Sequence, residues 1–432
     1  MIVAVLSACV CLAVQPVVGG DGTPGRTDYR KQLEELRAKA AGPVAWDALM
    51  EARELLLKAG EAVMGERGRG IPWAALVDEQ ADPGERGLAQ RGLEEVRKAA
   101  IGEVIARVAQ AGNVGRPMPA DVALVESDLC DLWTLRACCW VNRVDMLQAA
   151  EEGRWDAWVD RAAENFAMAK VYSTDTEMVG YLAGVVVCQV TLEDIERVLG
   201  RGTVPEAALA RLASLLDSSL PLPRPGAAVQ GARLMSLASI HATYTRDDPP
   251  GMASRQEAVA KTEEFYAGAG RVVGLGFAER RKDAFRFAEF ESALDTKRHR
   301  VLAVTMPNLP GAIEKMDEVE VEAAGVEVMV ALERYRLKHG AYPETLAPLS
   351  PAFLRSVPRD PFTGAEMLYR GPKGGPHAGG RAWVVYSAGY DQKDDGGRED
   401  TEDPTRAITG RGMAGRAGGL DFIVNPAPKK GE

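Results

Sequence analysis

The sequence predicts a mainly α-helical protein, an irregular helical bundle or short solenoid, with a small α+β module at its C-terminal end. Apolar residues recur three and four positions apart over most of the chain, and short β-like runs replace this pattern after residue 340. The 432 residues, 46% apolar and 26% charged, are enough to bury a substantial core. The formal net charge of −10 argues against a dedicated nucleic-acid-binding protein, which usually has a basic excess.

The N-terminal segment is typical of a secretory signal peptide. Residues 1–14 form an uncharged apolar run, shorter than the roughly 20 residues that a membrane span requires, and small residues precede Gly20. We therefore predict a signal peptide at 1–19, a flexible leader at 20–27, and export to the periplasm or the extracellular space. No Lys or Arg precedes the apolar run, so either the true start lies upstream or the signal is an uncharged variant. Two alternatives to a cleaved signal peptide remain, the first suggested by the lipobox-like sequence Leu6-Ser7-Ala8-Cys9. One is a lipoprotein signal anchored through Cys9, and the other is a buried N-terminal element of a cytoplasmic protein.

The next part of the chain, residues 28–305, is predicted to form a helical domain. Four segments combine the helical apolar period with strong helix formers on the opposite face. They are 29–41, 45–64, 92–112 and 205–220. Residues 151–172 follow a pattern of helix, glycine turn and second helix. The prolines of 221–226 cannot continue a helix, so the domain has a possible subdivision there. Two further amphipathic segments cover roughly 253–302.

The four cysteines beyond the signal peptide all lie in apolar, helix-like sequence. They are Cys130, Cys138, Cys139 and Cys188. Without a C-x-x-C spacing, zinc and thioredoxin-like sites have no support. We interpret these residues as small buried hydrophobes. A disulfide between Cys188 and the 130–139 helix is the alternative in an oxidising compartment.

Residues 306–432 are predicted to form a separate packing unit that begins with a long helix from Gly311 to His339. Its apolar stripe consists of Val321, Ala324, Val328, Leu332 and Tyr335. Gly340 has the place of a glycine that ends a helix, and a proline follows closely. Short β-like runs are then expected at 366–370, 381–389 and 420–424. Because a short hairpin alone is only marginally stable, the long helix should pack on these strands.

An acidic loop follows the second β-like run. Its carboxylates are those of Asp391, Asp394, Asp395, Glu399, Asp400, Glu402 and Asp403. Calcium takes six to eight oxygen ligands from carboxylates and carbonyls on a bendable loop, which this segment could supply. An EF-hand is rejected, because Lys393 stands where the template needs an oxygen and a strand precedes the loop. From the residues alone, a solvated acidic loop is the alternative.

Four segments of the C-terminal module together resemble the C-terminal half of the major pseudopilins of type II secretion. They are ALERYRLKHGAYPETLAPL (331–349), VPRDPFTGAEMLYR (357–370), VVYSAGYDQKDDGG (384–397) and DFIV (421–424). The resemblance covers about 312–424. It implies a globular pseudopilin-like head with calcium in its acidic loop, and Asp391, Asp394 and Asp395 are the residues that we expect to bind the ion.

The sequence departs from pseudopilins ahead of this module. The short basic leader, the processing glycine and the membrane helix of that family do not precede it, so pilus assembly by the usual helix packing is not expected. A large helical domain precedes it instead, as in a group of uncharacterised bacterial envelope proteins with the same two-part layout.

These features together predict an exported envelope protein with a non-enzymatic binding or assembly role, linked as one option to a type II secretion or pilus-like system. We expect its helical domain to present a groove to protein or peptide partners in the cell envelope. Neither a nucleic-acid partner nor a membrane span in the mature chain is expected, and no residue is assigned a catalytic or cofactor-binding role. The alternative is an uncharacterised hydrolase with its site between the helices. Converging carboxylates in a deep polar pocket would favour the hydrolase, and a shallow apolar groove would favour the binding protein.

Overall fold

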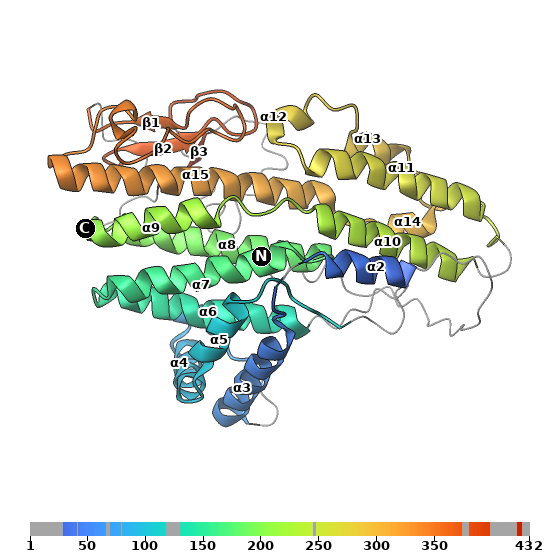
Figure 1. Cartoon of the computed structure of the whole chain (residues 1–432), viewed down its shortest axis with the longest axis horizontal. Coiled ribbons are helices and arrows are strands. Elements are labelled where there is room, and N and C mark those ends of the chain that lie inside the picture. The colour runs from blue at the N-terminus through green and yellow to red at the C-terminus, as the bar shows by residue number, and fades with distance from the viewer. Residues whose placement is uncertain are drawn as a thin grey trace.

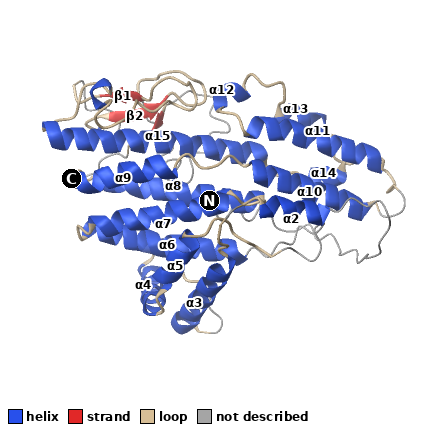
Figure 2. Ribbon diagram, in the orientation of Figure 1, coloured by secondary structure: helices blue, strands red, loops and turns tan. Residues whose placement is uncertain are grey.

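The computed structural model of the chain is mainly helical, with a small antiparallel sheet of three strands (Figures 1 and 2). It describes residues 29–40, 42–65, 70–78, 80–117, 130–244, 248–373, 380–397 and 421–425. The expected signal peptide and leader, and the acidic residues from Glu399 to Asp403, therefore lie outside the described residues.

Eight α-helices precede the proline-rich segment at 221–226 in the described residues. They are α2 (Tyr29–Ala38), α3 (Trp46–Met64), α4 (Pro83–Lys98), α5 (Ile101–Ala109), α6 (Cys130–Glu151), α7 (Trp155–Ser173), α8 (Met178–Leu199) and α9 (Glu206–Ser219). The segment 92–112, expected as one helical stretch, is broken between α4 and α5. Ala100 there has a φ of 56°, and this left-handed conformation ends one helix before the next begins.

The centre of the molecule is a stack of long helices, with α6 and α7 on one side of α8 and the long C-terminal helix on the other (Figure 1). The turn between α6 and α7 uses Gly153 in a left-handed conformation, as the helix–Gly–helix pattern of 151–172 predicts. Helices α7 and α8 approach each other closely at Gly184, where a Cβ atom would lie 2.6 Å from the carbonyl oxygen of Ala169. Helices α3, α4 and α5 project from the α6 side of this stack.

A second group of helices follows the break at 221–226. They are α10 (Gly226–Thr243), α11 (Arg255–Val273), α12 (Phe277–Arg280), α13 (Phe287–Ala293) and α14 (Arg300–Thr305). Phe265 of α11 lies at the centre of an aromatic cluster with Phe285, Phe287 and Phe290. The Phe-rich, Arg-rich segment around α13 therefore turns its rings into a small core.

The C-terminal part begins with α15 (Leu309–His339), the long helix that the apolar stripe predicts. Gly340 ends it in a left-handed conformation, with its N–H bonded to the carbonyl of Arg336 at 2.8 Å. The three β-like runs form β1 (Leu368–Arg370), β2 (Val384–Ser387) and β3 (Phe422–Ile423). The sheet order is β1-β2-β3, and both pairings are antiparallel.

Asp360, from the Asp-Pro motif, ties the turns after α15 to the end of the central strand. Its carboxylate, 1% exposed, accepts hydrogen bonds from the Ser387 hydroxyl at 2.8 Å, the Ala388 N–H at 3.1 Å and the Phe362 N–H at 2.9 Å. These three bonds replace the hydration that the buried carboxylate loses. The motif therefore has a structural role in this fold.

One hydrophobic core runs through both predicted parts of the chain. Buried residues from α3 to α9 belong to the same cluster as buried residues of α15 and of the sheet, such as Val385 and Val424. Helix α15 contacts α8 and α9 on one side and β2 on the other. It is thus the common element between the helical bundle and the sheet.

Helix α8 is the one described helix that is long and apolar enough, by length and composition alone, to cross a membrane. About two thirds of its apolar window, 67%, is buried inside the protein, as in the core helix of a bundle.

Cys188, on this helix, is a buried free thiol, as are Cys138 and Cys139 on α6. Burial raises the pKa of Cys138 and Cys139 to about 12, so both stay protonated at neutral pH.

Candidate functional site

The three aspartates expected to bind calcium lie on the segment that leaves β2. Asp391 is exposed, and its Oδ1 accepts the N–H of Lys393 at 3.0 Å. Asp394 Oδ1 accepts the Tyr386 hydroxyl at 3.0 Å and the Gly396 N–H at 2.8 Å. The N–H of Asp395 donates to Oδ1 of Asp421 at 3.2 Å. The aspartates thus engage the loop backbone and one strand residue.

Asp421, which the sequence analysis did not select, organises this loop. It directly precedes β3, and antiparallel pairing brings it beside the segment after β2. Its carboxylate also accepts the Gly397 N–H at 2.6 Å. Burial, together with the nearby Asp394 and Asp395, raises its pKa in spite of these backbone bonds. Within the described residues, no group of three or more His, Cys, Asp or Glu side chains is arranged to hold a metal ion. Calcium binding therefore stays a prediction.

An apolar groove lies between α8 and α15, at the junction of the helical bundle and the C-terminal part. Its volume is about 360 Å³. The lining residues are Tyr181, Val185, Leu220, Pro221, Leu222, Arg224, Met316, Val319, Glu320, Ala323, Ala324, Glu327 and Pro358. This volume is near the lower end of the range for small-molecule pockets, and it suits a few side chains better than a large cofactor.

One stripe of α15 forms the floor of this groove. Met316, Val319, Ala323 and Glu327 are three and four positions apart, so they lie on one face of the helix. The stripe extends about 16 Å along α15, at 1.5 Å per residue. Alanines at its centre leave room above the helix, while the prolines of the 221–226 segment keep that wall free of regular structure. The result is a shallow apolar track with polar groups along it.

Three charged side chains line the groove. Arg224 Nη2 bonds to Glu320 Oε1 at 2.7 Å, while Arg224 Nη1 is buried and has no hydrogen-bond partner among the described residues. Glu327 has no ion-pair partner in the described part of the chain. Burial and the neighbouring carboxylate of Asp217 raise its pKa. A ligand that offers a carbonyl to Arg224 and a cation to Glu327 would satisfy both groups.

Converging carboxylates do occur in the helical bundle, but arginines occupy the space between them. Arg116 Nη2 lies 2.7 Å from Asp131 Oδ2 and 3.1 Å from Asp175 Oδ2, and its Nη1 lies 2.9 Å from Glu177 Oε1. Arg37 of α2 adds a second bond to Glu177, at 3.0 Å. All side chains that contact Arg116 here are at most 8% exposed. This arrangement holds α2 and the segment after α5 against the ends of α6 to α8.

Comparison of the chain with protein-family models, with curated proteins and with solved structures gives no match. The resemblance to pseudopilin heads therefore rests on the sequence motifs alone and stays a prediction. No sequence signal marks Arg224, Glu320 and Glu327 as site residues. Arg224 lies within a proline tract, which predicts only the interruption of a helix, and carboxylates on a long helix usually face solvent. Packing of the 221–226 segment against α15 brings Arg224 beside Glu320, and Glu327 lies two turns further along the same helix.

Proposed function

We propose that this chain is an exported, non-enzymatic binding protein that holds a short apolar peptide segment with a basic residue in the groove between α8 and α15. The observation that carries the proposal is the groove itself. It is an apolar track in which the carboxylate of Glu327 and one guanidinium nitrogen of Arg224 find no partner among the described residues. Export is supported by the uncharged apolar run at the N-terminus. The partner is accordingly expected in the cell envelope.

The chemistry of the groove defines the class of partner. The apolar floor favours side chains such as Leu, Ile or Val, since burial of apolar surface drives association. Glu327 selects Lys or Arg, whose charge would offset the cost of keeping this carboxylate away from water. A main-chain carbonyl of the peptide would accept from Arg224. The stripe is about 16 Å long, the length of about five extended residues or three turns of helix, and the volume of about 360 Å³ takes a few side chains of a peptide that lies along it.

The C-terminal part supports an assembly role in addition. Its order of long helix, turns and three short antiparallel strands agrees with the proposed likeness to a pseudopilin head. Since α15 contributes both to that part and to the groove, a bound peptide would contact the sheet's supporting helix directly. If the natural peptide belongs to a component of a type II secretion or pilus-like system, the protein takes part in the assembly of that system.

Fluorescence anisotropy with labelled synthetic peptides tests the proposal. The probes are an amphipathic Leu-rich peptide with Lys on its polar face and the same peptide with Glu at each Lys position. We expect saturable binding of the Lys peptide and weak binding of the Glu peptide. Measurements belong at about 0.15 M salt, which screens general attraction to a chain of net charge −10.

Two variants and a control locate the site. Ala324→Trp fills the groove and should abolish binding, while Glu327→Gln should weaken the Lys peptide about tenfold, the effect of one charged hydrogen bond. Glu103→Gln, an exposed carboxylate on α5, removes the same charge elsewhere and should change nothing. If the Lys peptide binds Ala324→Trp as well as it binds wild type, the groove is not the site. Circular dichroism melts check that both variants are folded.

A further inference from the structure

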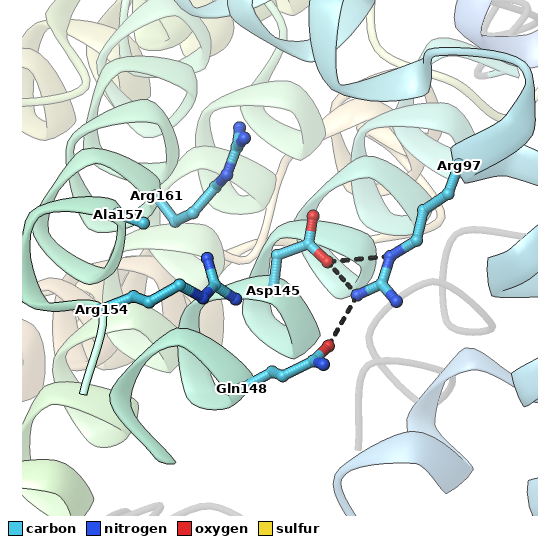
Figure 3. A pocket seen from close by; sticks show the side chains of 6 residues that line it. All are labelled: Arg97, Asp145, Gln148, Arg154, Ala157 and Arg161. Atoms are coloured by element: carbon cyan, nitrogen blue, oxygen red, sulfur yellow. Dashed lines mark hydrogen bonds and ion pairs between the residues drawn. The ribbon is translucent and has the colours of Figure 1, made fainter. Parts of the chain in front are cut away.

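A second cavity lies among α4, α6 and α7, away from the groove, and arginines dominate its lining. Its volume is about 290 Å³. The lining residues are Arg97, Asp145, Gln148, Arg154, Ala157 and Arg161 (Figure 3). Arg97 comes from the last turn of α4, Asp145 and Gln148 from α6, and the remaining three from the start of α7. The lining side chains alone carry three positive charges and one negative charge.

Within the described residues, the three guanidinium groups retain hydrogen-bond donors without an acceptor. Arg154 Nε donates to Glu152 Oε2 at 2.6 Å, and the two terminal nitrogens of Arg154 find no acceptor there. Arg161 Nη1 bonds to Glu164 Oε2 at 2.6 Å, and its other nitrogens find no acceptor in the same part of the chain. Both pairs are partly exposed, and exposed ion pairs are weak, so an incoming anion can compete for these arginines. Paired guanidinium donors match the oxygens of an oxyanion.

Helix α7 adds a favourable dipole at the same place. Arg154 is its N-cap and forms no side-chain cap, and Ala157, in the first turn, lines the cavity. For the N–H of Ala157, the described part of the chain provides no acceptor. The N-terminal end of a helix with free N–H groups attracts anions. The dipole thus acts in the same direction as the arginines.

Asp145 limits which anion fits. Its Oδ1 accepts hydrogen bonds from Nε of Arg97, at 3.1 Å, and from Nη2 of Arg97. Its Oδ2 accepts no hydrogen bond from the described residues. Figure 3 shows this second oxygen without a dashed line, between the guanidinium groups of the cavity. The negative charge of this carboxylate oxygen would repel an anion that carries no proton. An anion with an O–H group could donate to it.

We propose that this cavity binds hydrogenphosphate, with Arg154, Arg161 and the first turn of α7 around its charged oxygens and Asp145 as the acceptor of its proton. The two negative charges of the ligand match the excess of two positive charges among the six lining side chains, and the ligand would displace Glu152 and Glu164 from Arg154 and Arg161. This site lies apart from the peptide groove and uses none of its residues. Sulfate and phosphomonoesters carry no proton at about pH 8, so both are disfavoured beside Asp145.

Isothermal titration calorimetry of the whole chain at pH 8 tests this, with sodium phosphate, sodium sulfate and phenyl phosphate at equal ionic strength. We expect phosphate to bind at least tenfold more tightly than sulfate or phenyl phosphate. Arg154→Gln and Arg161→Gln should each weaken phosphate binding about tenfold. Asp145→Asn should remove the preference and allow sulfate to bind as tightly as phosphate, an effect that loss of structure would not produce.

Two controls separate this site from general charge effects and from the groove. Arg298→Gln removes an exposed arginine from the turn between α13 and α14. This arginine pairs with Glu257 of α11, outside the elements that line the cavity, so phosphate binding should not change. The groove variant Ala324→Trp should also leave it unchanged. The proposal is overturned if wild type releases no heat with millimolar phosphate, or if it binds sulfate and phosphate equally.

Discussion

The buried ion cluster around Arg116 predicts an unusual dependence of stability on pH. It contains two arginines, Arg37 and Arg116, and three carboxylates, Asp131, Asp175 and Glu177, so it has one negative charge in excess. Burial raises the pKa of Asp175 from 3.8 to about 6, in spite of the nearby Arg116. Asp175 Oδ2 also lacks a well-aligned hydrogen bond in the described residues. Asp175 therefore takes up a proton at a higher pH than an ordinary aspartate does.

The sign of the effect follows from proton linkage. Between about pH 6 and pH 4 the folded chain holds a proton on Asp175 that the unfolded chain does not, so stability from this residue rises as the pH falls. The full shift of about 2 pKa units corresponds to about 3 kcal/mol, of which about 2 kcal/mol develops between about pH 7 and pH 4.5. Most carboxylates in ion pairs act in the opposite direction, because acid breaks their pairs.

Urea unfolding of wild type and Asp175→Asn at several pH values measures this contribution. The amide cannot titrate, so the difference in unfolding free energy between the two proteins should move by about 2 kcal/mol in favour of wild type from about pH 7 to pH 4.5. This slope is expected whatever the amide does to absolute stability. Asp131→Asn is the contrasting variant. It removes a charge that bonds Arg116 through both oxygens and accepts the Tyr172 hydroxyl, and it should destabilise by about 3 kcal/mol or more.

Two results would refute this account of the cluster. One is a constant difference between wild type and Asp175→Asn across this pH range, which would mean that Asp175 titrates alike in the folded and unfolded states. The other is an Asp131→Asn variant as stable as wild type at neutral pH, which would mean that the pair with Arg116 contributes little in spite of its burial.

Three other predictions concern packing and the acidic loop. In urea unfolding, Gly184→Ala should destabilise the protein by about 1–3 kcal/mol, because the new methyl group would meet the backbone of α7. Gly60→Ala on α3 has open space around it and should stabilise the protein by up to about 1 kcal/mol. Calcium at millimolar concentration should raise the melting temperature of the whole chain above its value in chelator, and Asp391→Ala and Asp395→Ala should each abolish the rise. If wild type melts at the same temperature in calcium and in chelator, the segment is a solvated acidic loop. A fragment of residues 306–432 should melt with less cooperativity than the whole chain, because it exposes the side of α15 that packs on α8; a sharp melt would establish an independent unit.

Local sequence signals predicted the helices and strands well. The apolar stripe, the glycine at 340 and the following proline together mark the end of α15, because each acts through local backbone geometry. The strands were found for the same reason, from short β-branched and aromatic runs between turns. The break at Ala100 was missed, because alanine favours helix and only packing holds it in a left-handed conformation.

The candidate site could not be predicted in the same way, because local rules assign its residues to other roles. A periodic stripe predicts one buried face for α15, but this helix is enclosed by α8 and α9 on one side and by the sheet on the other. Carboxylates such as Glu322 and Glu333 are therefore almost fully buried, at 1% and 3% exposure, although their helix positions alone would suggest solvent. Their environment depends on contacts with residues more than a hundred positions away, such as Gln189 for Glu322.

The shared position of α15 also explains why a binding groove should occur where it does. A helix that packs on both a bundle and a sheet has to fit two surfaces at once. The small residues at positions 323 and 324 of α15 leave a gap at the point where the neighbour of α15 changes from α9 to the proline tract. Two polar groups line the gap without a partner among the described residues, the carboxylate of Glu327 and one nitrogen of Arg224. Filling a cavity with larger apolar residues commonly stabilises a protein. A groove that leaves these charges without partners among the described residues is thus better explained by ligand binding than by stability. Ala324→Trp separates the two explanations. We expect this variant to be at least as stable as wild type and to lose binding of the Lys peptide.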